Sequence, residues 1–466
     1  MRIIAVDVGS SSVKAGVFKG GRFRNFSHVP VASQMHGAEV EIPAGGLLKA
    51  VEEAIRIAAD GHRRMDALAL DTFCPGVVTL DKQRQPLAGC ITHQDRRSVP
   101  QSHEIEEAIG RENHLRIAGN RPFPGGIAST SLLWLRQNQP ASWKRTAFIG
   151  QASSLIIYHL TGRWVIDPSQ AAFLGLYDIT RGDWSAELCD CIGVKPAQLP
   201  ELAPADQILG KLSAGAARRL GLPADMPVIG GLVDTSAAML ATELHAGQLV
   251  HSAGSSDVLA LCVSAARPAD DLLTRPLGVE IVFPRRTLAV STIAAGGSSI
   301  RWAFENFFRD MKHKKFRELI SKFATEAADH ARRPAAAGER AGKKSAASHA
   351  PSPDSNAPIF QPYLAGDRTS MEQHRGAFEN LTLSTTREDM LRAIVHALVA
   401  SSTARFQRLE KLHPVQKTVY TMGGQEELAS AMHRAWPGRH TFQPIEHEAL
   451  SGLARLAEKV LKKRGQ

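Results

Sequence analysis

Two short turns of glycine and serine are the residues of this chain best suited to bind phosphate. The first is Gly9-Ser10-Ser11-Ser12, followed by Lys14, and the second is Gly254-Ser255-Ser256. Small residues let backbone N–H groups and hydroxyls converge on a phosphate, because no large side chain blocks the approach. One such turn alone is more often structural, since turns prefer these residues. A pair is the stronger signal, because a nucleotide clamped by two domains needs one turn from each.

Two aspartates lie next to the same kind of strand end. Asp7 directly precedes the first turn, and Asp234 follows an apolar strand that is expected to end at Gly230-Gly231. Mg²⁺ is a hard cation that prefers carboxylate oxygen, often through water, so Asp7 is a candidate metal ligand. A carboxylate at Asp234 could deprotonate a hydroxyl for in-line attack on a γ-phosphate. The alternative role of Asp234 is the N-cap of a helix through the Ala-rich run 237–241.

The elements around these residues predict an α/β protein. Apolar residues 3–6 and 13–18 flank the first turn as a β-hairpin, and residues 249–252 and 258–263 flank the second in the same way. Between them lie a strand at 67–70 ending at Asp71, a helix around 132–135 and a strand near Val228. A capping box of Thr385 and Glu388 opens a long helix, and a strand at 418–420 precedes Gly423-Gly424 and a helix near Leu428.

Length and composition limit the classes of protein. The 466 residues predict two to three domains, and 43% hydrophobic with 22% charged residues describes a soluble globular chain. Five scattered cysteines indicate a reducing compartment; Cys189 and Cys191 lack the partners of a zinc site. With no signal peptide or membrane-spanning run, we expect a cytoplasmic protein.

The net charge of +10 and two other patterns favour no further class. Much of the excess lies in residues 331–350 and at the C-terminus, where solvation explains it, and no nucleic-acid recognition motif is present. Gly342-Lys343-Lys344-Ser345 has the wrong glycine spacing for a P-loop, and no dinucleotide fingerprint follows the first strand. Residues 334–358, rich in Ala, Pro, Ser and Lys, are predicted to form a disordered insertion.

The motifs resemble those of the FGGY family of carbohydrate kinases. The run from Asp7 to Lys14 is similar to its first phosphate motif, Asp-x-Gly-Thr-Thr/Ser-Ser-x-Lys/Arg, with Ser in place of Thr. Gly254-Ser255-Ser256 corresponds to its second phosphate turn. Further matches follow in chain order to about residue 457: Thr92-His93-Gln94-Asp95-Arg96-Arg97, Leu160-Thr161-Gly162 with Asp167 and Ser169, Gly231-Leu232-Val233-Asp234-Thr235, Gly296-Gly297-Ser298 with Trp302, Pro362 to Arg368, and Met422-Gly423-Gly424-Gln425, where the first Gly of the adenine-side motif is lost.

The resemblance implies a two-domain actin-like ATPase (ribonuclease H-like) fold, each domain a mixed sheet with flanking helices, divided at about 1–240 and 241–466. It implies that the domains close on ATP, Mg²⁺ and a sugar, with Asp234 as the general base and Asp7 serving the metal. The residues implied to hold the ATP phosphates and adenine are Gly9, Ser10, Ser11, Ser12, Lys14, Gly254, Ser255, Ser256, Gly297, Gly423, Gly424 and Gln425.

The sugar-contacting positions depart from the family pattern. Xylulokinase-like members have Met-His where this chain has Cys74-Pro75, and His93 replaces a Trp ahead of Asp95 and Arg96. The change at His93 exchanges an apolar ring for a polar one that titrates near neutral pH. Asp71-Thr72 and Asp234-Thr235 are similar to the rhamnulokinase and fuculokinase branches.

Several readings of the substrate and the activity therefore stay open. A ketose such as xylulose is expected, and a deoxyketose or a polyol is an alternative. A sugar- or nucleotide-binding regulator without turnover is a second reading, a basic nucleic-acid-associated protein is a third, and a homodimer is left open.

Overall fold

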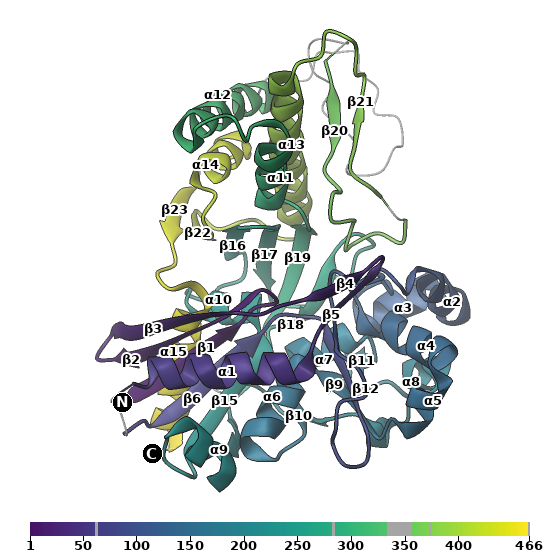
Figure 1. Cartoon of the computed structure of the whole chain (residues 1–466), viewed down its shortest axis with the longest axis vertical. Helices are drawn as coiled ribbons and strands as arrows, with labels where there is room; N and C mark the ends of the chain where they lie inside the picture. The colour runs from purple at the N-terminus through teal and green to yellow at the C-terminus, as the bar shows by residue number, and fades with distance from the viewer. Residues whose placement is uncertain (61–63, 282–284, 333–356, 373, 465–466) are drawn as a thin grey trace. The chain divides into compact units, whose positions relative to one another are not determined.

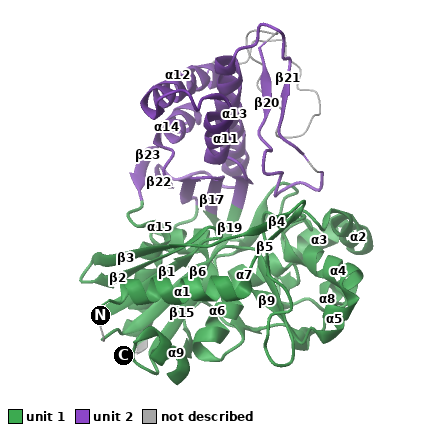
Figure 2. Ribbon diagram, in the orientation of Figure 1, with its two compact units in different colours: residues 1–246, 262–289, 445–466 green, residues 247–261, 290–444 purple. Residues whose placement is uncertain are grey.

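Two six-stranded sheets with flanking helices form the framework of the chain. The computed structural model describes residues 1–60, 64–281, 285–332, 357–372 and 374–464 (Figure 1). Two compact units divide it: unit 1 comprises residues 1–246, 262–289 and 445–466, and unit 2 comprises 247–261 and 290–444 (Figure 2). Most of the predicted insertion at 334–358 lies outside the described residues.

The first sheet places three parallel strands side by side. β1 pairs parallel with β6, β6 pairs parallel with β15, and β2 and β3 extend the sheet antiparallel beyond β1. Because the parallel strands share one direction, the residues after their carboxyl ends lie along one edge. The strand order is β14 (Ile208–Lys211), β15 (Pro227–Val233), β6 (Ala67–Thr72), β1 (Arg2–Val8), β2 (Ser12–Lys19) and β3 (Arg22–Pro30).

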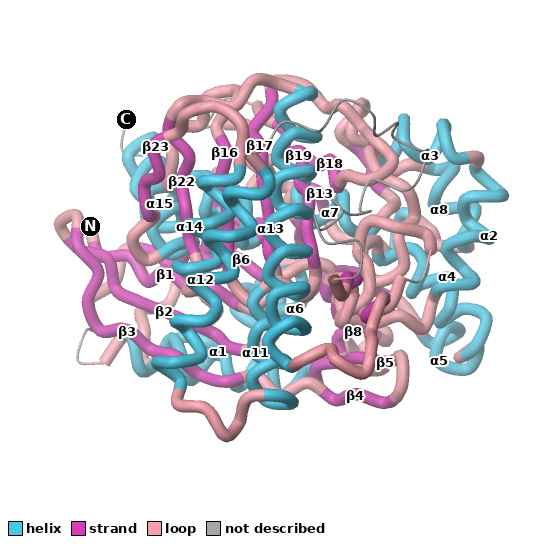
Figure 3. The backbone as a smooth tube through the Cα atoms, turned by 90° about the horizontal axis from the view of Figure 1, so that it is seen from above, coloured by secondary structure: helices cyan, strands magenta, loops and turns pink. Residues whose placement is uncertain are grey.

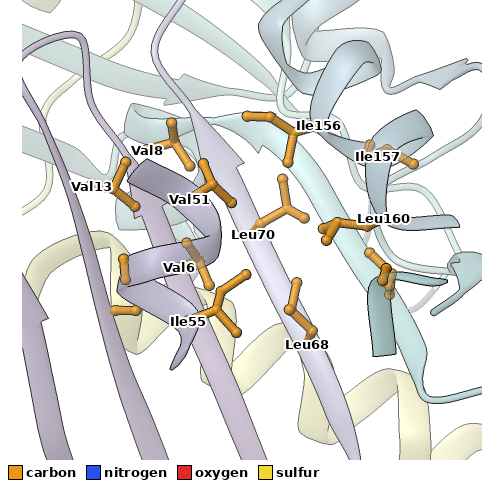
Figure 4. Packing of buried hydrophobic residues seen from close by; sticks show 14 of the residues in the cluster. Val6, Val8, Val13, Val51, Ile55, Leu68, Leu70, Ile156, Ile157 and Leu160 are labelled. Carbon is orange, nitrogen blue, oxygen red and sulfur yellow. The ribbon is translucent and has the colours of Figure 1, made fainter. Parts of the chain in front are cut away.

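Alternation along β1 decides which face of this sheet each side chain meets. Val6 and Val8 belong to a buried core with Leu70 of β6 and with residues of α1 (Ala44–Ala58) and α6 (Ala152–Thr161), as Figure 4 shows. Successive side chains of a strand point to opposite faces, so Asp7 projects away from this core. The helices α10 (Asp234–Leu240) and α15 (Glu448–Arg464) pack on each other and against β6.

Unit 1 also contains a smaller sheet, two pairs of short strands and several helices. A five-stranded sheet runs β4 (Gln34–His36), β5 (Glu39–Ile42), β8 (Cys90–Thr92), β7 (Gly76–Leu80) and β9 (Phe148–Gln151). The paired short strands are β10 (Val165–Ile166) with β13 (Glu201–Leu202) and β11 (Tyr177–Asp178) with β12 (Asp183–Trp184). The remaining elements are α2 (Val99–Ile109), α3 (Arg111–Ala118), α4 (Ala128–Asn138), α5 (Pro140–Arg145), α7 (Pro168–Leu174), α8 (Ala186–Ile192), α9 (Ala214–Leu220) and β18 (Leu273–Pro276).

The second six-stranded sheet, like the first, combines an antiparallel hairpin with parallel strand pairs. β16 pairs antiparallel with β17 and parallel with β22, and β22 pairs parallel with β23. The order of this six-stranded sheet is β18, β19 (Thr287–Ile293), β17 (Asp257–Val263), β16 (Leu249–Ala253), β22 (Thr418–Met422) and β23 (Thr441–Pro444). Helices α12 (His313–Ala331), α13 (Arg387–Leu412) and α14 (Glu426–Ala435) lie side by side (Figures 1 and 3). Helix α11 (Gly297–Phe307) packs against α13. The strands β20 (Ile359–Gln361) and β21 (Ala377–Glu379) pair as an antiparallel hairpin.

Both predicted hairpins are confirmed, and two predicted boundaries are wrong. The strand near Val228 does not end at Gly230-Gly231 but runs to Val233, because both glycines have positive φ and absorb a bulge in the pairing with β6. The capping box lies one residue later than predicted. Thr386 and Asp389 exchange the two cap hydrogen bonds, while the Thr385 hydroxyl accepts from the Thr382 N–H instead.

Candidate active site

Three carboxylates gather at the carboxyl ends of the three parallel strands. Asp7 of β1 pairs in register with Asp71 of β6, and Asp71 pairs with Leu232 of β15. Leu232 precedes Asp234 by two residues. The structure therefore brings together the two predicted site residues Asp7 and Asp234. Asp71 is a third carboxylate, which the sequence placed at a strand end and in the pair Asp71-Thr72 but did not assign to the site. A carboxylate within an otherwise apolar strand was the available signal, because such a group is costly to bury.

The surroundings of Asp7 and Asp71 disfavour their charged forms. Burial raises the pKa of Asp7 to about 6, and the neighbouring Asp234 adds to that rise. Burial also raises the pKa of Asp71 well above its usual range, reinforced by Asp7 and Asp234. The Lys14 ammonium opposes the rise at Asp7, since its Nζ lies 4.0 Å from the Asp7 carboxylate and 3.2 Å from that of Glu448. A cation placed here would relieve the same repulsion.

The first Gly-Ser turn closes tightly beside Asp7. The Gly9 N–H donates to the Ser12 carbonyl at 2.9 Å, and the Val31 N–H donates to the Ser11 carbonyl at 2.9 Å. Ser11 is exposed and Ser10 is partly exposed. The turn thus has a firm backbone with hydroxyls open to solvent, an arrangement suited to an anion, and its phosphate role stays a prediction.

Asp234 begins α10. The N-cap position belongs to Val233, so the alternative that Asp234 is the N-cap is wrong by one residue. Its Oδ1 accepts the Thr235 N–H at 2.5 Å, and the residue is partly exposed. A carboxylate in the first turn of a helix is stabilised by the positive end of the helix dipole. Asp234 is therefore held as an accessible carboxylate, in contrast to the fully buried Asp71.

The predicted nucleotide residues of unit 2 lie together at one edge of its sheet. The Gly297 N–H donates to the Gly254 carbonyl at 3.0 Å, and the Ser298 N–H donates to the Ser255 carbonyl at 3.0 Å. The Gln425 N–H donates to the Ala253 carbonyl at 3.2 Å, which joins the third segment to the same place. A β-carbon on Gly297 would press on the Gly254 carbonyl and on the Gln425 side chain, so only glycine fits. The structure thus collects Gly254, Ser255, Ser256, Gly297, Gly423, Gly424 and Gln425.

A buried network that sequence reasoning missed supports the second Gly-Ser turn. Asp257 directly follows Ser256 and is bonded to His251 at 2.8 Å and to Arg405 at 2.5 Å. His251 reaches His433 at 2.8 Å through its other ring nitrogen. Despite burial, Arg405 and His251 hold the pKa of Asp257 below its usual range. Because removing one partner of a buried charge pair is costly, this network should hold the turn in one conformation.

The stability of unit 2 should depend on pH through His433. Burial lowers the pKa of His433 to about 3. Below about pH 6.5, His433 is protonated in the unfolded chain but stays neutral in the folded chain. The unfolding free energy therefore falls by up to about 1.4 kcal/mol for each unit by which the pH is lowered. Unfolding measured between pH 7 and pH 5 should lose less stability in His433→Gln than in the wild type. An exposed control, His28→Gln, should keep the wild-type loss, and an unchanged loss in His433→Gln would contradict this account.

The predicted sugar-side residues lie in two places of unit 1. Cys74 and Pro75 are buried between β6 and β7. Asp95 is fully buried, accepts the Val40 N–H at 2.7 Å and pairs with Arg97 at 2.8 Å. These contacts hold the loop together.

Arg96 and His93 belong to the same loop as Asp95. The Arg96 Nη1 donates to the His93 carbonyl at 2.8 Å and to the Asp95 carbonyl at 2.9 Å. Both contacts shape the loop itself. Direct sugar contact by Cys74, Pro75, His93, Asp95 and Arg96 therefore stays a prediction.

Two family models cover most of the chain. The N-terminal domain model of the FGGY family of carbohydrate kinases matches residues 2–241, and the C-terminal domain model of that family matches residues 249–432. Curated relatives span most of the chain at low identity. A xylulose kinase of Bacillus subtilis is 24% identical over 91% of this chain and 80% of its own length, and a gluconokinase of the same organism is 22% identical over 85% and 74%.

Solved structures share the fold over nearly the whole chain. A xylulose kinase from Rhodospirillum rubrum superposes with a TM-score of 0.79 at 21% identity, covering 98% of this chain and 89% of its own. A gluconate kinase from Lactobacillus acidophilus superposes with a TM-score of 0.81 at 18% identity, covering 99% and 89%. These likenesses confirm the predicted two-domain actin-like ATPase fold class. Among the described residues, no helix is long and apolar enough to span a membrane.

Proposed function

Since the chain belongs to the FGGY family of carbohydrate kinases, we propose that it transfers the γ-phosphoryl group of ATP to a hydroxyl of a ketose, such as xylulose or a related pentulose or hexulose, with Asp234 as the general base. The observation that carries this proposal is the position of Asp234. It is a partly exposed carboxylate in the first turn of α10, near the partly exposed Asp7 and the fully buried Asp71. A base must reach the hydroxyl proton. Asp71 is fully buried, and the Lys14 Nζ lies 4.0 Å from the Asp7 carboxylate, so the partly exposed Asp234 is the candidate of the three.

Asp234 and the residues of the two Gly-Ser turns have different roles in the proposed phosphoryl transfer. Asp234 accepts the proton of the attacking hydroxyl, whose oxygen then forms a bond to the γ-phosphorus in line. The bond between that phosphorus and the β-γ bridging oxygen breaks, and ADP leaves with the electron pair. Lys14 and the hydroxyls of Ser10, Ser11 and Ser12 bind phosphate oxygens near that point. In unit 2, the turn Gly254–Ser256 and the segments at Gly297 and Gly423–Gln425 bind the remainder of the nucleotide. Exclusion of water from the reacting groups would favour the sugar hydroxyl over hydrolysis.

Asp7 fits a magnesium ion that arrives with the nucleotide. Mg²⁺ commonly binds proteins through one or two carboxylates and completes its shell with phosphates and water. Burial and the nearby Asp234 raise the pKa of Asp7 to about 6 even though Lys14 acts in the opposite direction, so a further cation would be favourable there. The described residues hold no group of three or more His, Cys, Asp or Glu arranged as a closed metal site. Bound there, the ion would neutralise charge on the phosphates. Asp7 would hold it, and Lys14, whose Nζ also lies 3.2 Å from the Glu448 carboxylate, would remain the cation that binds phosphate.

A substrate panel tests the proposal. ATP consumption with Mg²⁺ would be measured over pentuloses, hexuloses, deoxyketoses, heptuloses, polyols and aldonates, because relatives are named for both xylulose and gluconate. Turnover with one sugar that is lost in Asp234→Ala but kept in Asp190→Asn, an exposed carboxylate of α8, would support the kinase and name its substrate. Binding of ATP with no turnover on any sugar would instead favour the regulator, which the changes at Cys74, Pro75 and His93 motivate.

A further inference from the structure

Arg275 is a buried cation beside the first turn of α10. The residue is the third of strand β18 and only 1% exposed. Its Nη2 donates to the Thr235 hydroxyl at 2.6 Å, and its Nη1 donates to the Ser236 hydroxyl at 2.5 Å. One guanidinium thus holds the two residues that directly follow Asp234. The planar fork of an arginine suits such a two-point contact, and a lysine could not reproduce it.

Thr235 links the guanidinium of Arg275 to the carboxylate of Asp234. Arg275 fixes the side chain of Thr235, and the backbone N–H of Thr235 donates to Asp234 Oδ1 at 2.5 Å. On the preceding side, the Val233 N–H donates to the Ser169 hydroxyl at 3.1 Å. The residues before and after Asp234 are therefore both held by side chains from other elements, α7 and β18. A carboxylate framed in this way has little freedom to drift.

Burying the charged guanidinium of Arg275 is energetically unfavourable. Burial lowers the pKa of Arg275 to about 10, a value at which the group is still charged at neutral pH, while Cys74, Asp234 and Asp167 act in the opposite direction. The positive end of a helix is also an unfavourable neighbour for a cation. Its Nη1 and Nη2 hydrogen bonds go to hydroxyls and to the Pro276 carbonyl, and its buried Nε has no hydrogen-bond partner. An apolar side chain would fill this space at lower cost, so the position favours a role in the site.

We propose that Arg275 is a positioning residue for Asp234: its guanidinium locks the first turn of α10 so that the carboxylate keeps one orientation toward the sugar hydroxyl. This inference rests on the proposed function, because it takes Asp234 as the general base. Arg275 is too buried to touch the sugar itself. Its effect should therefore fall on the rate of the chemical step and spare the binding of either substrate.

Three variants test the assignment in the full-length enzyme with its best sugar. Arg275→Met removes the fork, and kcat should fall about 10²-fold with the KM for sugar and ATP within about twofold. Arg275→Lys keeps the charge but only one contact, so kcat should recover part of that loss. Ser236→Ala removes one acceptor and should lower kcat in the wild type but hardly further in the Arg275→Met background, since both changes break one link.

Controls separate this role from a purely structural one and from failure of the proposed function. Arg218→Met, at an exposed arginine of α9, should leave kcat unchanged, and the folded fraction of every variant is measured by its unfolding midpoint. A kcat loss that only follows the loss of folded protein would overturn the proposal, as would additive effects of Arg275→Met and Ser236→Ala. A rise in the sugar KM at unchanged kcat would make Arg275 a binding residue and overturn it too. Full activity of Asp234→Ala would instead overturn the proposed function.

Discussion

Replacing Asp234 with Asn is expected to lower kcat for sugar phosphorylation by about 10³-fold, because a positioned general base contributes about 10² to 10⁴ in rate. Asn keeps the size of the side chain and can still accept the Thr235 N–H, so the first turn of α10 should keep its shape. What Asn cannot do is take a proton. The loss should therefore appear in kcat, measured by coupled ATP consumption at saturating sugar.

The binding of ATP separates loss of the base from loss of the fold. Titration of Asp234→Asn with ATP should give a Kd within about twofold of the wild type, since phosphate and adenine contacts are assigned to other residues. Asp190→Asn, which removes an exposed carboxylate from α8, should be indistinguishable from the wild type in both measurements. Retention of more than a tenth of wild-type kcat in Asp234→Asn would mean that another group accepts the proton.

Replacing Gly452 with Ala is expected to lower the unfolding free energy of unit 1 by about 3 kcal/mol, because overpacking a close contact costs about 1–3 kcal/mol and sometimes more. Gly452 lies in α15, where a β-carbon would overlap the carbonyl oxygen of Ala237 in α10. The Ala237 carbonyl belongs to helical backbone, and a β-carbon is fixed directly to the backbone of α15, so neither can move aside as the end of a side chain can. The two helices would have to separate, and α10 carries Asp234 at its start.

A second glycine-to-alanine change provides the matched control. Gly45 lies in the first turn of α1, and a β-carbon there meets no atom within 4 Å. Gly45→Ala should be neutral or stabilise the protein by up to about 1 kcal/mol, since alanine loses less conformational entropy in a helix. Chemical denaturation of both variants checks the pair. Equal stability of Gly452→Ala and the wild type would show that α10 and α15 tolerate a wider spacing.

Local sequence patterns were sufficient for the features that depend on neighbouring residues. The turn Gly9–Ser12 and its flanking strands were predicted because turn residues and strand alternation act over a few positions. The same logic placed Asp7 and Asp234 at strand ends, and the order of motifs along the chain identified the family that the two domain models then confirmed. The boundary error at Gly230 arose because a bulge at two glycines lets the strand continue, and the error at Thr385 arose because two adjacent threonines could both cap the helix.

Tertiary structure alone decided the contacts between distant positions. Arg275 meets Thr235 across 40 residues, and Asp257 meets Arg405 across 148, and no local pattern encodes either pair. The return of residues 445–466 to unit 1, which brings Gly452 against α10, is likewise invisible in the order of the chain. A sequence shows which groups could do chemistry at a strand end. The partners that hold those groups are chosen by packing, because burial and charge pairing depend on the elements that meet in space.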